Sequence, residues 1–176
     1  MSVAIPAQAG TQSSMIEWRF ASFDELTARE LHDAFQLRSA VFVVEQTCPF
    51  LDIDGVDPLC WHLLGWASGT VHNSTSDVAC PPSLVAYCRL VPPGVKYPEP
   101  SIGRVITARE ARRTGAGRAL MREAVARAEA LWPHQALRIG AQMYLKGFYE
   151  AFGFRQSSEP YDEDGILHIE MIREGR

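Results

Sequence analysis

The sequence predicts one α/β domain with a mixed central β-sheet, antiparallel in its N-terminal half and parallel in its middle strands, flanked by helices. Segments 101–107 and 136–142 have the composition of strands, and segment 117–131 between them carries apolar residues at helical spacing. A strand, a helix and a strand in this order form a parallel pair with a right-handed crossover. Segments 60–66 and 84–91 follow one another without a helix, as antiparallel neighbours do.

The remaining elements are expected on either side of this unit. Residues 1–14 are small and polar and predict a disordered tail, so that the single domain covers residues 15–176. Asp24 is the expected N-cap of the first helix. Periodicity and turn-forming residues predict strands over 16–20 and 168–173, further helices over 37–46 and 144–154, and loops over 48–58 and 67–83.

The composition excludes several classes of partner. The chain has 176 residues and a formal net charge of −4, so it lacks the basic character with which proteins bind nucleic acid. No apolar run is long enough for a membrane span, and the segment before Met15 has no export signal, so we expect a cytoplasmic protein without a membrane partner. The cysteines fit no zinc pattern and are expected to be free, buried thiols: Cys48, Cys60, Cys80 and Cys88.

The stretch RRTGAGRAL, residues 112–120, places two glycines at the head of the predicted helix. Main-chain N–H groups and the dipole at a helix N-terminus attract an anion, and glycine lets a phosphate oxygen approach the backbone. The turn is not a P-loop, because Arg118 and Ala119 follow Gly117, and not a dinucleotide-binding turn, because residue 120 is leucine. It indicates either a diphosphate-binding turn or a tight turn without a ligand.

Two motifs in the C-terminal half resemble those of the GNAT superfamily of N-acetyltransferases, which implies the GNAT fold. One motif is Arg/Gln-x-x-Gly-x-Gly/Ala, here Arg112, Gly115 and Gly117, and the other is the helix FYEAFGF over 148–154. A predicted strand separates the two motifs, as it does in that superfamily. Over about residues 16–173 the chain further resembles the ElaA-type proteins, through the segments QLRSAVFVVEQTCPFLDIDGVD, IGRVI, GAQMYLKGFYEAFGF and YDEDGILHIEM.

The resemblance implies that the protein binds acetyl-CoA as a co-substrate and uses no metal. The end of strand 101–107 would pair with the pantetheine arm, and the glycine turn would hold the diphosphate. Gln142 stands where many GNAT enzymes have an asparagine that contacts the cofactor, and glutamine keeps both a donor and an acceptor. The implied cofactor-binding residues are Val105, Ile106, Thr107, Arg112, Arg113, Thr114, Gly115, Ala116, Gly117, Arg118 and Gln142.

The resemblance also implies catalytic residues. Tyr149 matches the tyrosine that protonates the leaving thiolate in such enzymes. The attacking amine must lose a proton, and Glu45 is the first candidate for the base, ahead of Asp52, Asp54, Asp57, His62 and His168. We expect the acceptor to contact Asp54, His62 and His168. The DIDGVD loop lacks calcium-binding spacing and is either a solvated turn or a negative rim that attracts a cationic amine.

The sequence therefore predicts an acetyl-CoA-dependent N-acetyltransferase that acts on a small-molecule or peptide amine by direct attack in a ternary complex. Two alternatives remain open: a GNAT-fold module that binds CoA or acyl-CoA without turnover, and an acyltransferase that uses a longer acyl donor. An exposed strand edge would allow a homodimer. The fold alone does not select the acceptor.

Overall fold

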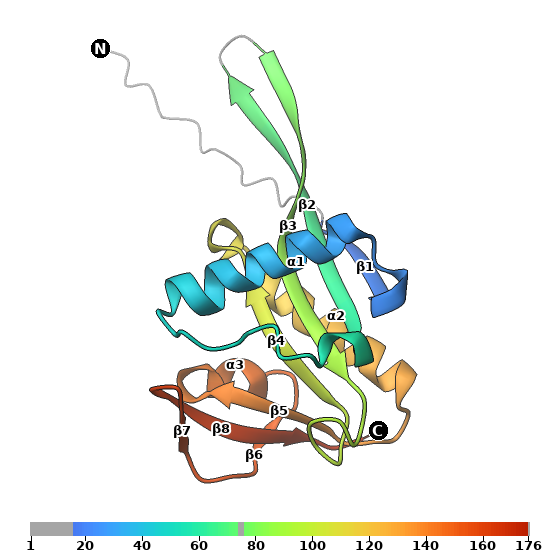
Figure 1. Ribbon diagram of the computed structural model, residues 1–176, viewed down its shortest axis with the longest axis vertical. Coiled ribbons are helices and arrows are strands. Elements are labelled where there is room, and N and C mark those ends of the chain that lie inside the picture. The colour runs from blue at the N-terminus through green and yellow to red at the C-terminus, as the bar shows by residue number, and fades with distance from the viewer. Residues whose placement is uncertain (1–15, 74–75, 176) are drawn as a thin grey trace, which may run out of the picture.

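The computed structural model describes residues 16–73 and 76–175, with the backbone alone for residues 69–73 and 76–81. An eight-stranded sheet has the order β1-β2-β3-β4-β5-β8-β6, with β7 paired to β8, and α1 and α2 cover opposite faces of it (Figure 1). The strands are β1 (Ile16–Ser22), β2 (Trp61–Asn73), β3 (Ser76–Val91), β4 (Ser101–Thr107), β5 (Leu137–Gln142), β6 (Arg155–Gln156), β7 (Tyr161–Glu163) and β8 (Ile166–Arg173). The helices are α1 (Ala28–Arg38), α2 (Ala116–Leu131) and α3 (Lys146–Glu150). The predicted mixed α/β class is confirmed.

The first three strands are antiparallel, as predicted, but they are longer than expected. β1 pairs with β2, and β2 pairs with β3. The loop predicted over 67–83 is wrong, because β2 continues to Asn73 and β3 begins at Ser76, and together they extend as a two-stranded ribbon (Figure 1). The segment is rich in small polar residues, which favour loops, but β-branched residues such as Thr70 and Val71 favour strands.

Thr27, and not Asp24, caps the first helix. The Glu30 N–H donates to Thr27 Oγ1 at 3.2 Å, and the Thr27 N–H donates to the Glu30 carboxylate at 2.8 Å, which completes a capping box. Asp24 lies instead in a short 3-10 helix before α1. The helical piece predicted over 37–46 is present as a π-helical segment, Ser39–Glu45, that continues directly from α1.

The parallel strands β4 and β5 are joined at one end and open at the other. Among the described residues, their pairing is limited to Ser101 opposite Arg138, and the strands then diverge (Figure 1). The Arg138 guanidinium closes the joined end, because it bonds the carboxylates of Glu99 and Glu170. On its other edge β4 pairs with β3 through a bulge, at which Arg104 has a φ of +54°.

The C-terminal third contains a shorter helix than the sequence predicts. α3 spans five residues, whereas the prediction was 144–154, because a 3-10 turn over Met143–Leu145 precedes it. The predicted stop at Gly153 lies in the turn that follows α3, with a φ of +85°. β8 pairs antiparallel with β5, and the sequence did not reveal β6 and β7, which are two and three residues long.

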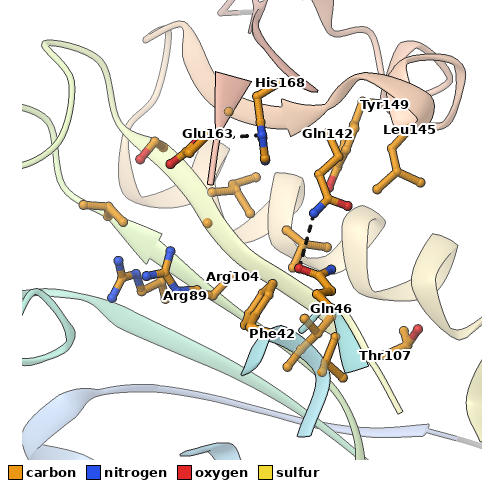
Figure 2. A pocket seen from close by; sticks show the side chains of 18 of the residues that line it. Phe42, Gln46, Arg89, Arg104, Thr107, Gln142, Leu145, Tyr149, Glu163 and His168 are labelled. Carbon is orange, nitrogen blue, oxygen red and sulfur yellow. Dashed lines mark hydrogen bonds and ion pairs between the residues drawn. The ribbon is translucent and has the colours of Figure 1, made fainter. Parts of the chain in front are cut away.

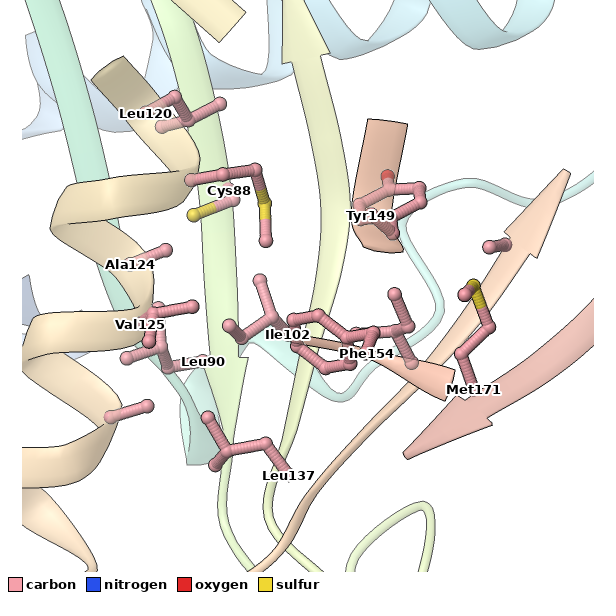
Figure 3. Close-up of a cluster of buried hydrophobic side chains, with 14 of the residues drawn as sticks. Cys88, Leu90, Ile102, Leu120, Ala124, Val125, Leu137, Tyr149, Phe154 and Met171 are labelled. Atoms are coloured by element: carbon pink, nitrogen blue, oxygen red, sulfur yellow. The ribbon is translucent and has the colours of Figure 1, made fainter. Parts of the chain in front are cut away.

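Two hydrophobic clusters hold the helices against the sheet. α2 packs against β3, β4 and β5 through residues that include Leu120 and Ala124, and Tyr149 of α3 belongs to the same cluster (Figure 3). On the other face, Ala34 of α1 packs against Tyr87. Burial of one large apolar side chain contributes about 1.5–3 kcal/mol. This packing fixes α3, and with it Tyr149, beside the split in the sheet.

Other sequence predictions concern the cysteines and the membrane. Cys48, Cys60 and Cys88 are free and buried, as predicted. The side chain of Cys80 and the tail predicted over 1–14 lie outside the described part of the chain. Within residues 16–73 and 76–175, none of the helices combines the length and the apolar character that a membrane crossing requires.

Candidate active site

A cavity of about 470 Å³ lies in the split between β4 and β5 (Figure 2). Its walls come from β4, the C-terminal end of β5, α3 and the π-helical segment. Strands that diverge leave room that side chains do not fill, and in open α/β sheets ligands bind at such strand ends. The lining includes Phe42, Glu45, Gln46, Arg89, Arg104, Val105, Ile106, Thr107, Arg112, Gln142, Tyr149, Glu163 and His168.

β4 presents an open main-chain edge to this cavity. Val105, Ile106 and Thr107 line it, and β5 pairs with β4 at Ser101 alone within the described residues. Main-chain N–H and C=O groups require partners when water is excluded. An extended ligand that lies along β4 can supply these partners as an added strand would.

The glycine turn leads from the cavity to the N-terminus of α2. Gly115 is the N-cap, and its φ of +97° lies in the left-handed region that favours glycine. The first four N–H groups of a helix have no partner within it, so this end of α2 can bind an anion. Arg112 lines the cavity, whereas the rest of the predicted turn lies beyond it at the head of α2: Arg113, Thr114, Gly115, Ala116, Gly117 and Arg118.

Tyr149 lines the cavity although its side chain is only 6 % exposed. Its ring packs edge-on against Phe148 and Phe154, with ring centroids 5.1 and 6.3 Å apart. Among the described residues, the hydroxyl has no hydrogen-bond partner. Burial raises the pKa of the phenol well above its ordinary value, so the group keeps its proton at neutral pH. Tyr149 therefore offers the cavity a free proton donor.

Gln142 connects the two sides of the cavity. It lies at the end of β5, and its amide nitrogen donates to the side-chain oxygen of Gln46 at 3.4 Å (Figure 2). Its carbonyl oxygen accepts a hydrogen bond from the Tyr144 hydroxyl at 2.6 Å. Both ends of the amide are engaged by flexible side chains, which a ligand can replace.

Glu45 is held by the arginine of the glycine turn. Arg112 donates to both carboxylate oxygens of Glu45, at 2.6 and 3.0 Å. The hydrogen bonds from Arg112 lower the pKa of Glu45. A carboxylate in this state is a weak base, so the geometry argues against the base role predicted for Glu45.

The acids of the DIDGVD loop are bound to arginines that the sequence did not single out. Asp52 accepts hydrogen bonds from Arg38 and Arg104, and Asp54 accepts them from Arg104 and Arg89. Asp57 bonds both Arg38 and Arg89 and closes the circle. We call this closed set of alternating charges the charge ring: Arg38, Asp52, Arg104, Asp54, Arg89 and Asp57.

The charge ring corrects both interpretations of the DIDGVD loop. Asp52 and Asp57 are 5 % and 2 % exposed and all three acids are paired with arginines, so the loop is not a negative rim, and its solvent-exposed part is limited to its tip at residues 53–55. Burial opposes the ionisation of Asp54, but the hydrogen bonds from Arg89 outweigh burial and hold the pKa of Asp54 far below its usual range. The oxygens of Asp54 are thus occupied, which argues against its predicted contact with an acceptor. The sequence did contain a signal for this charge ring. Three acids lie within six residues, and acids that become buried need positively charged partners.

His62 does not belong to the cavity. It is fully buried, with Nδ1 2.8 Å from the Tyr87 hydroxyl and Nε2 3.0 Å from the Asp57 carbonyl oxygen. Burial lowers the pKa of His62, so the ring is a neutral structural residue. Its burial outside the cavity argues against the predicted contact of His62 with the acceptor.

His168 lines the cavity beside Glu163 (Figure 2). Its Nδ1 lies 2.8 Å from the Ile166 carbonyl oxygen, so the neutral ring carries its hydrogen on Nδ1 and has a lone pair on Nε2. Among the described residues, Nε2 has no partner. A Glu163 carboxylate oxygen lies 3.9 Å from Nδ1, and the Tyr161 ring stacks on the imidazole. This arrangement holds His168 as a proton acceptor.

Comparison with known proteins decides the family. A model of the acetyltransferase (GNAT) domain matches residues 93–174. The Escherichia coli protein ElaA is 40% identical over 163 residues, which cover 91% of this chain and 97% of ElaA. The chain belongs to the GNAT acetyltransferase family. A UPF0039 protein from Synechocystis is 41% identical and covers 89% of this chain and 94% of its own length.

Solved structures agree with this membership. The crystal structure of Escherichia coli ElaA superposes on the GNAT chain with a TM-score of 0.78, over 91% of this chain and all of ElaA. An acyl-CoA N-acyltransferase from Pseudomonas aeruginosa gives a TM-score of 0.78 at 36% identity, over 90% of this chain and 99% of its own. The protein is thus an acyltransferase with the GNAT fold, and the family uses acetyl- or acyl-CoA. No group of three or more metal-ligating side chains is present among the described residues.

Proposed function

We propose that this GNAT protein transfers an acetyl group from acetyl-CoA to a primary amine by direct attack in a ternary complex. The observation that carries the proposal is Tyr149, a protonated phenol without a described partner that reaches the cavity between β4 and β5. A thioester placed along β4 brings its sulfur to this side of the cavity. The reaction then requires a donor site, an acid and a base.

The donor site follows from the open edge of β4 and the head of α2. The residues present suit CoA, because unpaired main-chain N–H groups and the turn arginines Arg113 and Arg118 favour its diphosphate, while Arg112 stays paired with Glu45. Val105, Ile106 and Thr107 would pair with the pantetheine amides, and Gln142 would bond the same arm after it leaves Gln46. When bound, acetyl-CoA supplies the activated acetyl group.

Tyr149 is proposed as the acid. As the amine nitrogen bonds to the acetyl carbon and the carbon–sulfur bond breaks, the electron pair of that bond goes to sulfur. The Tyr149 hydroxyl donates its proton to this sulfur, so CoA leaves as a thiol. Because burial raises the pKa of Tyr149, the proton is present over the physiological pH range.

His168 is proposed as the base in place of Glu45. The attacking amine must lose a proton, and the Nε2 lone pair of His168 is free within the cavity. Glu163 stabilises the imidazolium that forms, because its carboxylate lies near Nδ1. Glu45 is bound to Arg112 and lacks this freedom.

Replacement of Tyr149 by phenylalanine tests the proposal. With an amine acceptor and acetyl-CoA, we expect Tyr149→Phe to lower the rate of thiol release by about 10²-fold or more, the usual contribution of a general acid. The dissociation constant for CoA, measured by calorimetry, should stay within threefold of the wild-type value. This corresponds to a change in binding free energy on the order of 1 kcal/mol or less.

The matched control is Tyr87→Phe. Tyr87 is also a buried tyrosine, but its hydroxyl bonds His62 and it does not line the cavity. Thiol release by Tyr87→Phe should equal that of wild type. If the wild-type protein binds CoA but releases no thiol with any amine, the protein is a binding module and the proposal fails.

A further inference from the structure

We propose that the acceptor is a small amine that also carries a carboxylate, and that the carboxylate binds between Arg104 and Lys96. This inference rests on the proposed transfer to an amine and adds the chemical class of the acceptor. It follows from a second hollow of about 530 Å³ next to the donor cavity. The two share several lining residues, so a molecule in the hollow reaches the donor: Phe42, Gln46, Arg89, Lys96, Arg104, Gln142, Glu163 and His168.

Arg104 is held in place with one nitrogen unused. Its guanidinium lies over the rings of Phe42 and Phe50, at 5.7 and 5.5 Å from the ring centroids. Its Nε and Nη2 donate to Asp52 and Asp54 of the charge ring. Among the described residues, Nη1 has no partner, and the side chain is 17 % exposed. A fixed guanidinium with a free N–H at a cavity wall is a donor for a carboxylate oxygen.

A second unpaired N–H lies on the same wall. Arg89 is 2 % exposed and lines both hollows, and its Nε is buried without a hydrogen-bond partner among the described residues. A Cβ added to Gly103 would lie 4.0 Å from this nitrogen, so the absence of a side chain at Gly103 lessens the cover over Arg89 Nε. A buried N–H without a partner is costly, and an acceptor oxygen of a ligand removes that cost.

Lys96 adds a positive charge to the same hollow. Within the described part of the chain, its ammonium group has no ion pair or hydrogen bond, and it contacts the face of the Tyr97 ring at 5.4 Å. Lys96 is exposed at the surface, and partial desolvation together with the nearby Arg104 and Arg89 lowers its pKa, against the opposing effect of Glu163. The two arginines form ion pairs with the acids of the charge ring, whereas Glu163 acts on Lys96 only from a distance, so the Lys96 ammonium group can still bind an anionic ligand directly.

The opposite wall suits the amine of the same molecule. Figure 2 shows Glu163 and His168 across the cavity from Arg89 and Arg104. An ammonium group is attracted by Glu163 and gives its proton to His168, while the carboxylate faces the cations. The hollow also exposes Leu51 and Val95, which are 77 % and 38 % exposed, so an apolar body on the acceptor finds a contact there.

The test compares three acceptors that share one apolar body: phenylalanine, phenylalaninamide and 2-phenylethylamine. Each is supplied with acetyl-CoA, and thiol release gives kcat/KM. We expect phenylalanine to exceed both others by about tenfold or more, since a hydrogen bond to a charged group contributes about 1.5–3 kcal/mol. Intrinsic reactivity favours the amide, whose amine is less basic and less protonated, so a preference for the acid must come from the protein.

Lys96→Gln removes the free charge from the hollow. This variant should lower kcat/KM for phenylalanine about tenfold through KM, and leave phenylalaninamide unchanged. Lys146→Gln is the matched control, because Lys146 is the only other lysine in the sequence and lines neither hollow. It should keep the wild-type preference for the acid.

Binding in the presence of CoA separates this inference from the proposed transfer. Calorimetric titration of the CoA-bound protein should show tighter binding of phenylalanine than of phenylalaninamide, lost in Lys96→Gln. If the amide or the plain amine is preferred or equal in both rate and binding, the inference is wrong while transfer to amines stands. If no acceptor is acetylated although phenylalanine is still preferred in binding, the proposed transfer fails and the carboxylate site stands.

Discussion

At the scale of single residues, hydrogen-bond partners decide which of several chemically suitable side chains can act. Glu45 and His168 are both candidate bases, and both line the cavity. Glu45 is engaged by Arg112 through both oxygens, whereas His168 is oriented by the Ile166 carbonyl oxygen and keeps Nε2 free. The sequence shows residue types but not partners, which is why it ranks Glu45 first.

A pair of substitutions tests this assignment. His168→Gln should lower kcat/KM by about 10²-fold or more, the usual contribution of a general base.

Glu45→Gln is the comparison for that measurement. Glu45 is bound by Arg112 and takes no proton in the proposed mechanism, so kcat should change less than about fivefold, about 1 kcal/mol in the activation free energy. A large loss of kcat/KM in Glu45→Gln together with an unchanged kcat/KM in His168→Gln would assign the base to Glu45 instead. The carboxylate near His168 Nδ1, that of Glu163, is unaltered in both variants.

At the scale of elements, the strands and helices with strong periodicity could be predicted, and those that depend on distant partners could not. β4 was predicted over the residues it occupies, and the start of α2 was placed within one residue, because both are dense in apolar residues. The ribbon of β2 and β3 was missed, since its pairing depends on the other strand and not on its own composition. The charge ring was missed for the same reason, because Arg38, Arg89 and Arg104 lie on α1, β3 and β4.

The charge ring joins those three elements to the loop over 48–58. Its contribution to the free energy of unfolding can therefore be measured by removing one of its acids. Asp52→Ala leaves Arg38 Nε and Arg104 Nε without their carboxylate, and removal of one partner from a buried pair costs about 3–5 kcal/mol. Urea unfolding should therefore show a loss in the free energy of unfolding of this size. In Asp24→Ala the loss should be below about 0.5 kcal/mol, because Asp24 is exposed and caps no helix. Equal losses in the two variants would mean that the ring adds no stability.

At the scale of the whole molecule, the split of the sheet is the feature that unites the donor and acceptor sides. Arg138 holds β4 and β5 together at one end, and the opening at the other end brings Arg112 of the glycine turn, Tyr149 and His168 around one cavity. The two motifs around Arg112 and Tyr149 could be read from the sequence because each is local. The position of these motifs relative to the acceptor wall could not be predicted from the sequence. That wall is formed by the π-helical segment, the charge ring and β8, which are distant from one another along the chain.

The binding of acetyl-CoA at the head of α2 is the central claim, and Gly117→Asp tests it most directly. Aspartate in the first turn of a helix favours folding, and a Cβ at residue 117 meets Thr107 at an ordinary contact of 3.7 Å, so the variant should be at least as stable as wild type. Its carboxylate would nevertheless repel the diphosphate. In calorimetric titrations with acetyl-CoA, we predict that wild type and Gly117→Ala bind alike and that Gly117→Asp binds about tenfold or more weakly, about 1.4 kcal/mol. Equal binding by Gly117→Asp, or no binding by folded wild-type protein, would contradict the account.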